Sequence, residues 1–582
     1  MTVLEAVPQA RPNRSQRAVL SATAAEGVSE GALAVLAAVP GWWRNRCVVA
    51  GIPLDEVWSL EEALTAPAPF PSEAYDQISP RDDLNDVSSE ELADAYVTAL
   101  DGKVRTSDGR HYTPAPLAQA LYEQAVAVLK RPPDGLVWDP ACGAGMLLLP
   151  PLRDWLRRHA DRAPDEVIEK IQSAVGGRDL DVAAVWLGNV LLAAELLPMW
   201  AKIDATSRTA LPALLSVGDG LQAPPASPQL AVLNPPYGRV RLDERDRERW
   251  SHVLFGHANR YGLFMGAMAE YLAPDGVMSA LVPAGWLGGS YFQRLRSFLA
   301  SSVPLKRLTY VGGRSGVFST GVLQETVLAT FKSGASHGAV VCGRVTLNGK
   351  TVSTPIGRGR LRRPVDGPWL LPRTEEDVGL ISAVQGMKHR LSDYGWSVST
   401  GPLVWNRHKS QLSDHPAGNA VKIIWAADLD GGVLHQDPSR DGLRYLTLRD
   451  RDERVLVLDR PAVLVQRTTA PEQPRRLLAT ALDSRSLSLW GGRVSVENHV
   501  NVLTEDPQLA LAPAKLSPRL LTALLSSEAA DRLYRCLTGS VAVSAYELSA
   551  LPLPPPEKIR LLDEVADELL QKEIACVYGL VP

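Results

Sequence analysis

The feature that most constrains the fold of this 582-residue chain is a regular alternation of strands and helices between residues 136 and 332. Apolar segments typical of buried strands lie at 136–139, 174–179, 230–233, 277–282, 307–311 and 327–331, and helical patterns fall between them. Such alternation is typical of βαβ units that build a mostly parallel sheet. The sequence therefore predicts an α/β fold for this part of the chain.

The length predicts more than one domain, because a single hydrophobic core stops growing at roughly 250 to 300 residues. Residues 1–87 are expected to form a partly helical N-terminal extension to which no role can be assigned. A capped helix should start at Ser88 and a second one at Thr113-Pro114, running to about residue 129. Beyond Gly334 short β-branched runs are separated by Gly, Pro and Arg, so residues 88–334 and 335–582 are expected to be separate domains. A capping box at Thr374 should open a helix in the last one.

The cysteines argue against a structural metal or a disulfide framework. They are scattered and include no Cys-x-x-Cys pair: Cys47, Cys142, Cys342, Cys536 and Cys576. No metal site is expected, and a reducing cytoplasm fits best.

Neither a secretory signal nor a membrane span is expected. The start of the chain has no basic stretch before an apolar one, and the apolar run near Leu191 is expected to be broken by Glu195 and Pro198. The formal charge of −4 neither supports nor excludes a nucleic-acid partner, because binding depends on where the basic residues lie.

A glycine-rich segment, Asp139-Pro140-Ala141-Cys142-Gly143-Ala144-Gly145, stands directly between a strand and a helix. In such a turn backbone amides can approach a ligand at the helix N-terminus. A bare Gly-x-Gly is about as often a purely structural turn. The acid that closes the strand favours a binding loop.

Two further acids follow later strands of the same region. Asp179 ends the second strand, where a carboxylate can accept both hydroxyls of a ribose, and Asp181 is expected to cap the next helix. Asp219, between two glycines, is read as a third strand-end acid, placed to accept a hydrogen bond from an adenine amine. Each alone could be an exposed turn acid.

The segment Asn234-Pro235-Pro236-Tyr237 follows the apolar strand 230–233 and precedes Gly238. Two prolines remove backbone donors and stiffen the loop, so that a carbonyl and the Asn234 amide can point outward at a substrate. The alternative is a plain proline turn. The glycine-rich loop and the two acids upstream disfavour it.

These motifs, in this order, resemble the gamma class of DNA adenine-N6 methyltransferases, specifically the Taq-type modification enzymes of type II restriction systems. The similarity covers about residues 88–332 and includes Tyr112-Thr113-Pro114 and the segments 261–264, 272–276, 282–287 and 316–318. It implies a Rossmann-like class I S-adenosylmethionine-dependent domain with a mixed, mostly parallel seven-stranded sheet. A C-terminal α+β target-recognition domain would follow.

The resemblance also assigns a cofactor, S-adenosylmethionine, and its binding residues. Asp179 would hold the ribose, Asp219 would accept from the adenine amine and Phe264 would pack against that ring. Many relatives have Glu where this chain has Asp179. The residues that would hold the methionine part are Thr113, Asp139, Pro140, Ala141, Cys142, Gly143 and Gly145.

For the substrate, the resemblance implies an adenine flipped out of double-stranded DNA. Its amine would be bound by Asn234 and the Pro235 carbonyl in the loop stiffened by Pro236, with Tyr237 stacked on the base and Phe318 edge-on to it.

Polar clusters in the C-terminal region suit a DNA surface, although a solvated basic surface is the alternative. The expected DNA contacts are Arg407, Lys409, Gln466 and Arg467. The wider clusters are Arg358, Arg360, Arg362 and Arg363 in a short loop, residues 405–409, and residues 466–469 with Arg475 and Arg476. Residues 466–469, 546–548 and 551–554 loosely resemble target-recognition domains.

The sequence thus predicts a cytoplasmic, nucleoid-associated monomer that methylates adenine N6 and protects DNA from a cognate restriction endonuclease without requiring contact with it. A cytosine-N4 enzyme would use the same geometry but usually starts its loop with Ser, where this chain has Asn234. A protein-glutamine methyltransferase and a non-enzymatic DNA-binding subunit are further alternatives. No convincing Asp…Glu-x-Lys nuclease motif is found in the first 90 residues.

Overall fold

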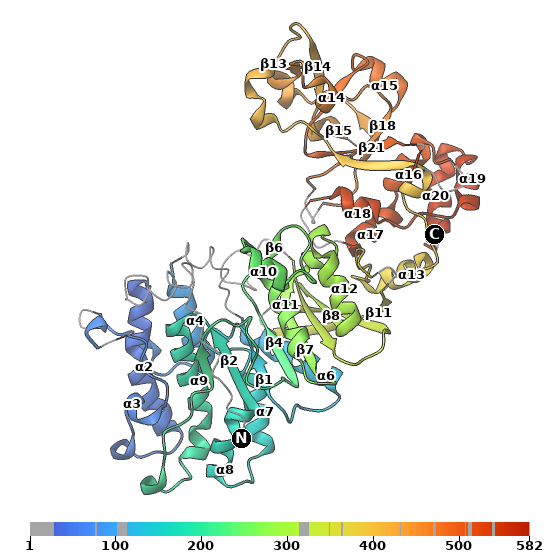
Figure 1. The fold of residues 1–582 in the computed structure, drawn as a ribbon. Coiled ribbons are helices and arrows are strands. Elements are labelled where there is room, and N and C mark those ends of the chain that lie inside the picture. Colours follow the sequence, from blue (N-terminus) through green and yellow to red (C-terminus); the bar gives the residue numbers. More distant parts are fainter. Residues whose placement is uncertain are drawn as a thin grey trace, which may run out of the picture. The chain divides into compact units, whose positions relative to one another are not determined.

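The computed structural model describes residues 28–70, 72–75, 78–101, 113–312, 325–348, 350–361, 365–430, 432–469, 473–506, 508–509, 515–537 and 542–580. They belong to two compact units (Figure 1). The first lies mainly within Met1–Gly238 and Glu270–Ala280. The second lies within Arg239–Ala269, Leu281–Arg314 and Val322–Pro582.

Helices open the first unit. α2 (Glu30–Val49) packs on α4 (Ser89–Ala99) and on α9 (Val182–Trp200), and it buries Trp42 and Trp43 completely. α4 begins at the predicted residue, because Ser88 and Glu91 form a capping box. α6 (Ala115–Leu129) starts directly after Pro114, also as predicted.

Five parallel strands, which lie wholly or mainly in the first unit, stand in the order β7-β4-β1-β2-β3. Figure 1 labels the first four of them. The five strands are β1 (Val137–Asp139), β2 (Val175–Asp179), β3 (Leu215–Val217), β4 (Leu230–Leu233) and β7 (Val277–Pro283), with α7 (Leu149–Arg158), α8 (Pro164–Ala174) and α9 in the connections. From β1 the chain proceeds to β2 on one side and later returns to β4 on the other. In open α/β sheets ligands bind at such a switch point, outside the carboxyl ends of the strands.

The apolar run near Leu191 belongs to the long helix α9. It continues through Glu195 and Pro198, and Glu195 forms an ion pair with Arg153. In the described part of the chain it is the one helix long and apolar enough to cross a membrane, but 78% of its apolar stretch is buried inside the protein. α9 is therefore a core helix of the first unit.

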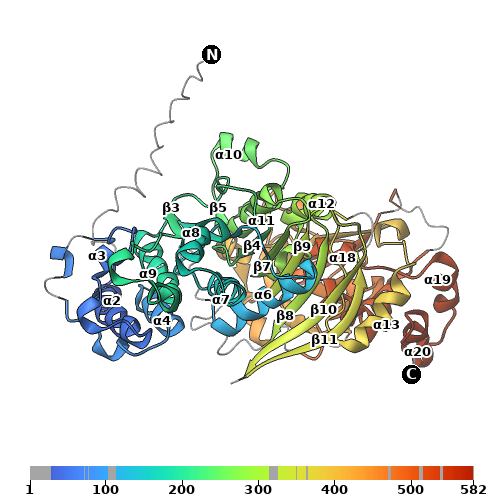
Figure 2. The ribbon, with the colours of Figure 1, turned by 90° about the horizontal axis from the view of Figure 1, so that it is seen from below.

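The second unit contains the remaining expected strands and two additional ones. β8 (Leu305–Gly312) pairs antiparallel with β9 (Thr326–Lys332) and parallel with β10 (Ala339–Asn348), which turns back into β11 (Lys350–Arg360). Figure 2 shows β8, β10 and β11 side by side. All six strands predicted by their residue ranges are present, and β10 pairs with β8 although it follows Gly334. Arg358 and Arg360 thus lie on a strand, not in the short loop predicted for them. The reason is that β11 pairs with β10, where Arg358 lies opposite Val341 and Arg360 opposite Ala339.

The rest of the second unit is α+β, as predicted. α13 (Glu375–Val384) starts at Thr374 with the expected capping box and packs on α17 (Glu528–Leu537). One four-stranded sheet has the order β12-β21-β18-β19, formed by Trp396–Thr400, Val500–Glu505, Ala462–Gln466 and Ala479–Leu482. The other has the order β13-β17-β14-β20, formed by Leu412–Ser413, Tyr445–Thr447, Ala420–Ile424 and Val494–Val496. The remaining C-terminal helices are α16 (Pro518–Leu525), α18 (Ala545–Ser549), α19 (Pro556–Asp563) and α20 (Asp567–Val577).

Candidate active site

The glycine-rich loop after β1 is a tight turn that requires glycine at two positions. Gly143 and Gly145 have φ angles of +47° and +81°, in the left-handed region that side chains disfavour. The loop is fastened at its start, where the Ala141 amide donates to Asp139 Oδ1 at 3.0 Å and the Cys142 amide donates to the Arg178 carbonyl at 3.1 Å. A side chain at Gly143 would meet no atom within 4 Å, so the backbone there borders open space.

Two glycines that sequence reasoning did not single out let other elements approach this loop. A Cβ at Gly177 on β2 would lie 2.8 Å from Cys142 Cβ, and one at Gly188 on α9 would lie 2.9 Å from the Ala144 carbonyl carbon. Real Cβ atoms do not come this close. The absence of both side chains therefore allows strand and helix to support the loop directly.

Asp139 and Cys142 are buried groups of the loop, and both have raised pKa values. Burial raises the pKa of Asp139 from 3.8 to about 8; the Ala141 amide opposes this rise and the nearby Asp179 charge adds to it. Burial likewise raises the pKa of the Cys142 thiol, so the thiol stays protonated. Cys142 contributes its backbone and its packing, rather than a nucleophile.

Asp179 links the loop to the next helix. Its Oδ2 accepts the Gly143 amide at 2.9 Å and its Oδ1 accepts the Asp181 amide at 2.9 Å. Asp181 caps α9, as predicted, by accepting from the amides of Ala183 and Ala184. The structure thus brings Asp179, the residue predicted to bind the ribose, against the glycine-rich loop. Asp179 is partly exposed.

Asp219 stands in the turn after β3, and Arg178 braces that turn. Asp219 Oδ1 accepts the Leu221 amide at 2.9 Å, which fixes the carboxylate. Arg178 Nη1 donates to the carbonyls of Asp219, Gln222 and Ala223 at 3.3 to 3.4 Å. Its guanidinium also lies over the Trp138 ring, 5.5 Å from the centroid. Sequence reasoning missed Arg178, because only the pairing of β2 with its neighbours reveals these contacts.

The Asn-Pro-Pro-Tyr segment leaves the carboxyl end of β4, and both of its polar side chains are hydrogen-bonded. Asn234 Nδ2 donates to Thr113 Oγ1 at 2.7 Å, and the Tyr237 hydroxyl donates to Asn234 Oδ1 at 3.0 Å. Thr113 is only 6% exposed, whereas Asn234 and Tyr237 remain partly exposed. Desolvation raises the pKa of the Tyr237 phenol, which therefore stays protonated at neutral pH. An amide held between two hydroxyl groups can present hydrogen-bonding atoms in a fixed direction.

Other predicted site residues lie in the second unit or outside the described residues. Phe264 is partly buried on α11 (Arg260–Tyr271) of the second unit, and Tyr112, Phe318, Arg362 and Arg363 lie outside the described residues. Within the described ranges no three or more His, Cys, Asp or Glu side chains gather in a group able to hold a metal ion.

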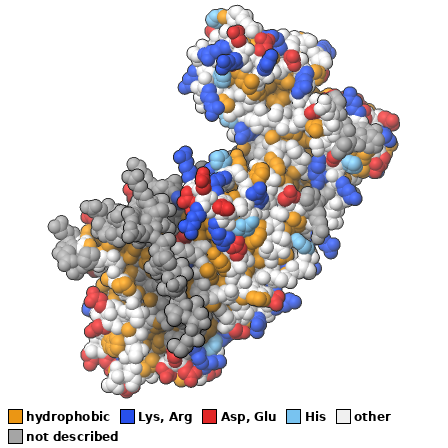
Figure 3. All heavy atoms as spheres, in the orientation of Figure 1, with side chains coloured by type: hydrophobic (Ala, Val, Ile, Leu, Met, Phe, Trp, Pro, Cys, Tyr) orange, Lys and Arg blue, Asp and Glu red, His pale blue; other side chains and the backbone are white. Residues whose placement is uncertain are grey.

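The predicted DNA contacts lie at separate places in the second unit. Arg407 and Lys409 are exposed, and the Lys409 ammonium lies 5.6 Å from the centroid of the Trp405 ring. Gln466 ends β18, and Arg467 donates from Nη1 to the Asn498 carbonyl at 3.0 Å. On the face in Figure 3, Lys and Arg side chains are interspersed with acidic ones instead of forming one basic stripe.

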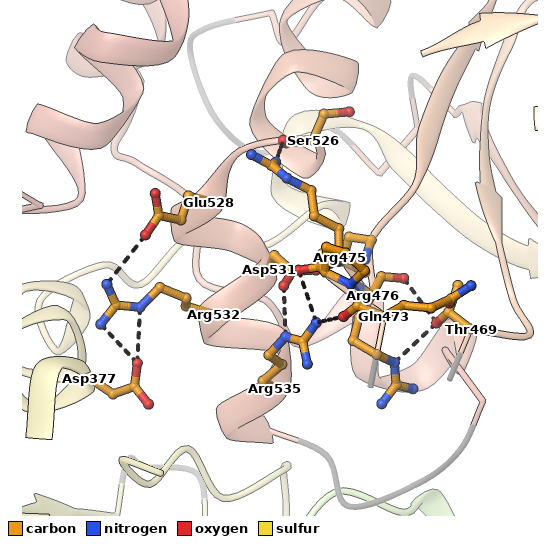
Figure 4. A network of polar contacts seen from close by, with 12 residues as sticks. Asp377, Thr469, Gln473, Arg475, Arg476, Ser526, Glu528, Asp531, Arg532 and Arg535 are labelled. Atoms are coloured by element: carbon orange, nitrogen blue, oxygen red, sulfur yellow. Dashed lines mark hydrogen bonds and ion pairs between the residues drawn. The ribbon is translucent and has the colours of Figure 1, made fainter. Parts of the chain in front are cut away.

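Arg476 does not belong to an exposed basic cluster, contrary to expectation. It is 3% exposed and donates from Nε to Thr469 Oγ1 at 3.0 Å, while Arg475 is exposed and donates to the Ser526 carbonyl (Figure 4). The cause is Asp531 on α17, whose Oδ1 accepts the Arg476 amide at 2.5 Å and the Leu477 amide at 2.8 Å. These bonds turn the segment inward at Arg476.

Comparison with known proteins places these motifs in context. No family model matches the chain. It is 25% identical over 351 residues to the type II methyltransferase M.PstI of Providencia stuartii, covering 58% of this chain and 67% of that protein. The chain resembles type II methyltransferases. M.BsuBI of Bacillus subtilis, also a type II methyltransferase, is 24% identical over 328 residues, 56% of this chain and 64% of that one. The chain thus spans about two thirds of the length of these curated relatives.

A solved structure supports the fold over nearly the whole chain. The type IIL restriction-modification enzyme MmeI, in complex with DNA, aligns with a TM-score of 0.50 at 12% identity, covering 98% of this chain and 93% of that one. At this identity the likeness concerns the fold. Together with the strand order, it confirms the predicted α/β class with a mostly parallel, Rossmann-like sheet.

Proposed function

We propose that this chain is a gamma-class methyltransferase that moves a methyl group from S-adenosylmethionine to N6 of an adenine flipped out of a specific double-stranded DNA sequence. The observation that carries this proposal is the Asn234 amide, fixed by two hydrogen bonds at the carboxyl end of β4. β4 neighbours β1, whose end carries the glycine-rich loop held by Asp179. The similarity to type II methyltransferases supports the same reading.

The residues after β1, β2 and β3 fit the cofactor. Gly143 borders open space and so admits a ligand against its backbone, while the Asp179 and Asp219 carboxylates suit ribose hydroxyls and an adenine amine. Bound there, the cofactor would supply an electrophilic methyl group on a positively charged sulfur. Thr113, the residues 139–145, Asp179, Asp219 and Phe264 are the proposed cofactor contacts.

The chain's own residues would capture and orient the base. Flipping costs a few kcal/mol, and stacking on one aromatic ring such as Tyr237 recovers about 1–3 kcal/mol. Hydrogen bonds from the amine to Asn234 Oδ1 and the Pro235 carbonyl would cover the remainder and direct the nitrogen lone pair away from the loop. After transfer the methylated amine would lose its extra proton to water, so no strong base is needed, and positioning and electrostatics would supply most of the acceleration.

The biological setting proposed is protection of DNA from a cognate restriction endonuclease, by a cytoplasmic monomer that need not contact that enzyme. Arg407, Lys409, Gln466 and Arg467 are proposed to contact the DNA, and Phe318 to contact the flipped base. Asn234 at the head of the loop favours adenine over cytosine. Mass analysis of nucleosides from DNA methylated by the chain tests this choice: N6-methyladenine is expected, and N4-methylcytosine would reassign the substrate.

The catalytic role is tested with Asn234→Ala. Because the amide is proposed to act on the base and not on the cofactor, methyl transfer should fall by roughly a thousandfold while the cofactor Kd changes less than about threefold. Transfer is measured with a radiolabelled methyl group and the Kd by calorimetry. Asn45→Ala, on α2, is the matched control and should behave as wild type. Equal loss of transfer and cofactor affinity in Asn234→Ala would make the loop structural only.

A further inference from the structure

A hydrogen bond connects two segments that are 121 residues apart, the approach to α6 and the loop after β4. Thr113 precedes the first residue of α6 by two positions, and its Oγ1 accepts from Asn234 Nδ2 at 2.7 Å. Thr113 is 6% exposed and Asn234 is partly exposed, so this bond is shielded from water on the Thr113 side. Shielding strengthens a hydrogen bond and makes its loss costly.

We propose that Thr113 is a positioning residue that holds the Asn234 side-chain amide in the plane needed to receive the target amine. This inference rests on the proposed function, because it concerns the same site. The amide of asparagine can rotate about its last side-chain torsion, which has a broad energy profile. Thr113 fixes the amide nitrogen, Nδ2, by its hydrogen bond. The amide oxygen, Oδ1, then points in one direction, toward the Tyr237 hydroxyl, which donates to it at 3.0 Å.

The role differs from the contact with the cofactor's methionine part that the resemblance assigns to Thr113. A pure cofactor contact affects how tightly the methyl donor binds, and saturation with the donor restores the rate. A residue that holds Asn234 affects the rate of transfer after both substrates are bound. The two roles therefore separate in a measurement of the single-turnover rate at saturating cofactor.

The experiment compares Thr113→Val, which keeps the shape but removes the acceptor, with Thr113→Ser, which keeps the hydroxyl. Thr113→Val should lower the single-turnover rate roughly tenfold even at S-adenosylmethionine concentrations that saturate the variant, as judged from its own measured Kd. Thr113→Ser should restore most of the rate. A wild-type rate in Thr113→Val at saturating cofactor, or a loss explained wholly by a raised Kd, overturns the proposal. Thr113→Ala replaces the valine variant if its circular dichroism shows misfolding.

A second readout does not depend on catalysis. In the protein labelled with 15N-asparagine, the Asn234 side-chain amide signal, identified by its disappearance in Asn234→Ala, should persist at its wild-type position in Thr113→Ser and shift or broaden in Thr113→Val. An unchanged signal in Thr113→Val overturns the positioning role even if the wild-type chain methylates DNA. A wild-type chain that transfers no methyl group refutes the proposed function alone, because the amide signal still tests the bond.

Discussion

Two carboxylates at the ends of neighbouring strands, Asp139 on β1 and Asp179 on β2, illustrate how position decides chemistry at the scale of single residues. Asp139 is 1% exposed and accepts the Ala141 amide, whereas Asp179 is partly exposed and holds Gly143. Burial raises the pKa of Asp139 to about 8, so this carboxyl retains a proton in the folded chain at pH values where the unfolded chain has lost it. The two acids, both next to the glycine-rich loop, therefore serve different purposes.

The raised pKa predicts how stability depends on pH. Between the unfolded value of 3.8 and the folded value of about 8, the native state binds one more proton than the unfolded state, so the free energy of unfolding falls as pH rises. From pH 6 to pH 9 this group should cost about 3 kcal/mol, and Asp139→Asn should remove that part of the decline. Urea denaturation at both pH values measures it, with the exposed Asp161→Asn as control. Identical declines in wild type and Asp139→Asn would contradict the prediction.

At the scale of elements, the site depends on how closely α9 approaches the loop after β1. A Cβ at Gly188 would lie 2.5 Å from Leu215 Cδ1 and 3.1 Å from Ala144 Cα, so the helix leaves no room for a methyl group. A glycine within a helix normally weakens it by about 1 kcal/mol. Here the close approach outweighs that cost, because it supports the loop that Gly143 and Gly145 shape.

Gly188→Ala should therefore destabilise the chain by about 1–3 kcal/mol through overpacking and weaken cofactor binding by displacing Ala144. Gly379→Ala is the matched control, since it is also a glycine in a helix, α13, but a Cβ there meets no atom within 4 Å. The control should be neutral or stabilising by up to about 1 kcal/mol. Thermal unfolding and calorimetric titration with cofactor give the two readouts. Equal stability and equal cofactor affinity in the two variants would show that the close contact at Gly188 does not support the loop.

At the scale of the molecule, one buried arginine ties distant parts of the second unit together. Arg296 on α12 (Gln293–Ser302) is fully buried and donates to the carbonyls of Trp286, Gly289 and Asp366 and to the Tyr546 hydroxyl, at 2.7 to 3.1 Å. Burial lowers its pKa, but each of these oxygens compensates for part of the lost hydration. The closing segment 546–548 is thereby joined to the segment after β7.

Arg296→Met should lower the free energy of unfolding by about 2–4 kcal/mol, because several buried carbonyls lose their donor at once. Arg294→Met, two residues earlier on the same helix but exposed, should change it by less than about 1 kcal/mol. Chemical denaturation followed by tryptophan fluorescence measures both. Similar small losses in the two variants would mean that Arg296 is not needed to join these segments.

The sequence by itself determined the features that depend on neighbouring residues. Capping boxes at Ser88 and Thr374, the cap at Asp181, the start of α6 and the six strands predicted by range follow from local hydrogen bonding and from apolar periodicity, which act within a few positions of the chain. The order of the motifs also placed Asp139, Asp179 and Asn234 at the ends of strands that turn out to be neighbours.

Only the tertiary structure decided which distant groups meet and which side chains are covered. The bond from Asn234 to Thr113, the support of the Asp219 turn by Arg178 and the burial of Arg476 all require partners far away in the chain. The pairing of β10 with β8 beyond Gly334 is of the same kind. In each case the contacts join residues that are far apart in the sequence. A pattern of adjacent residues therefore does not predict them.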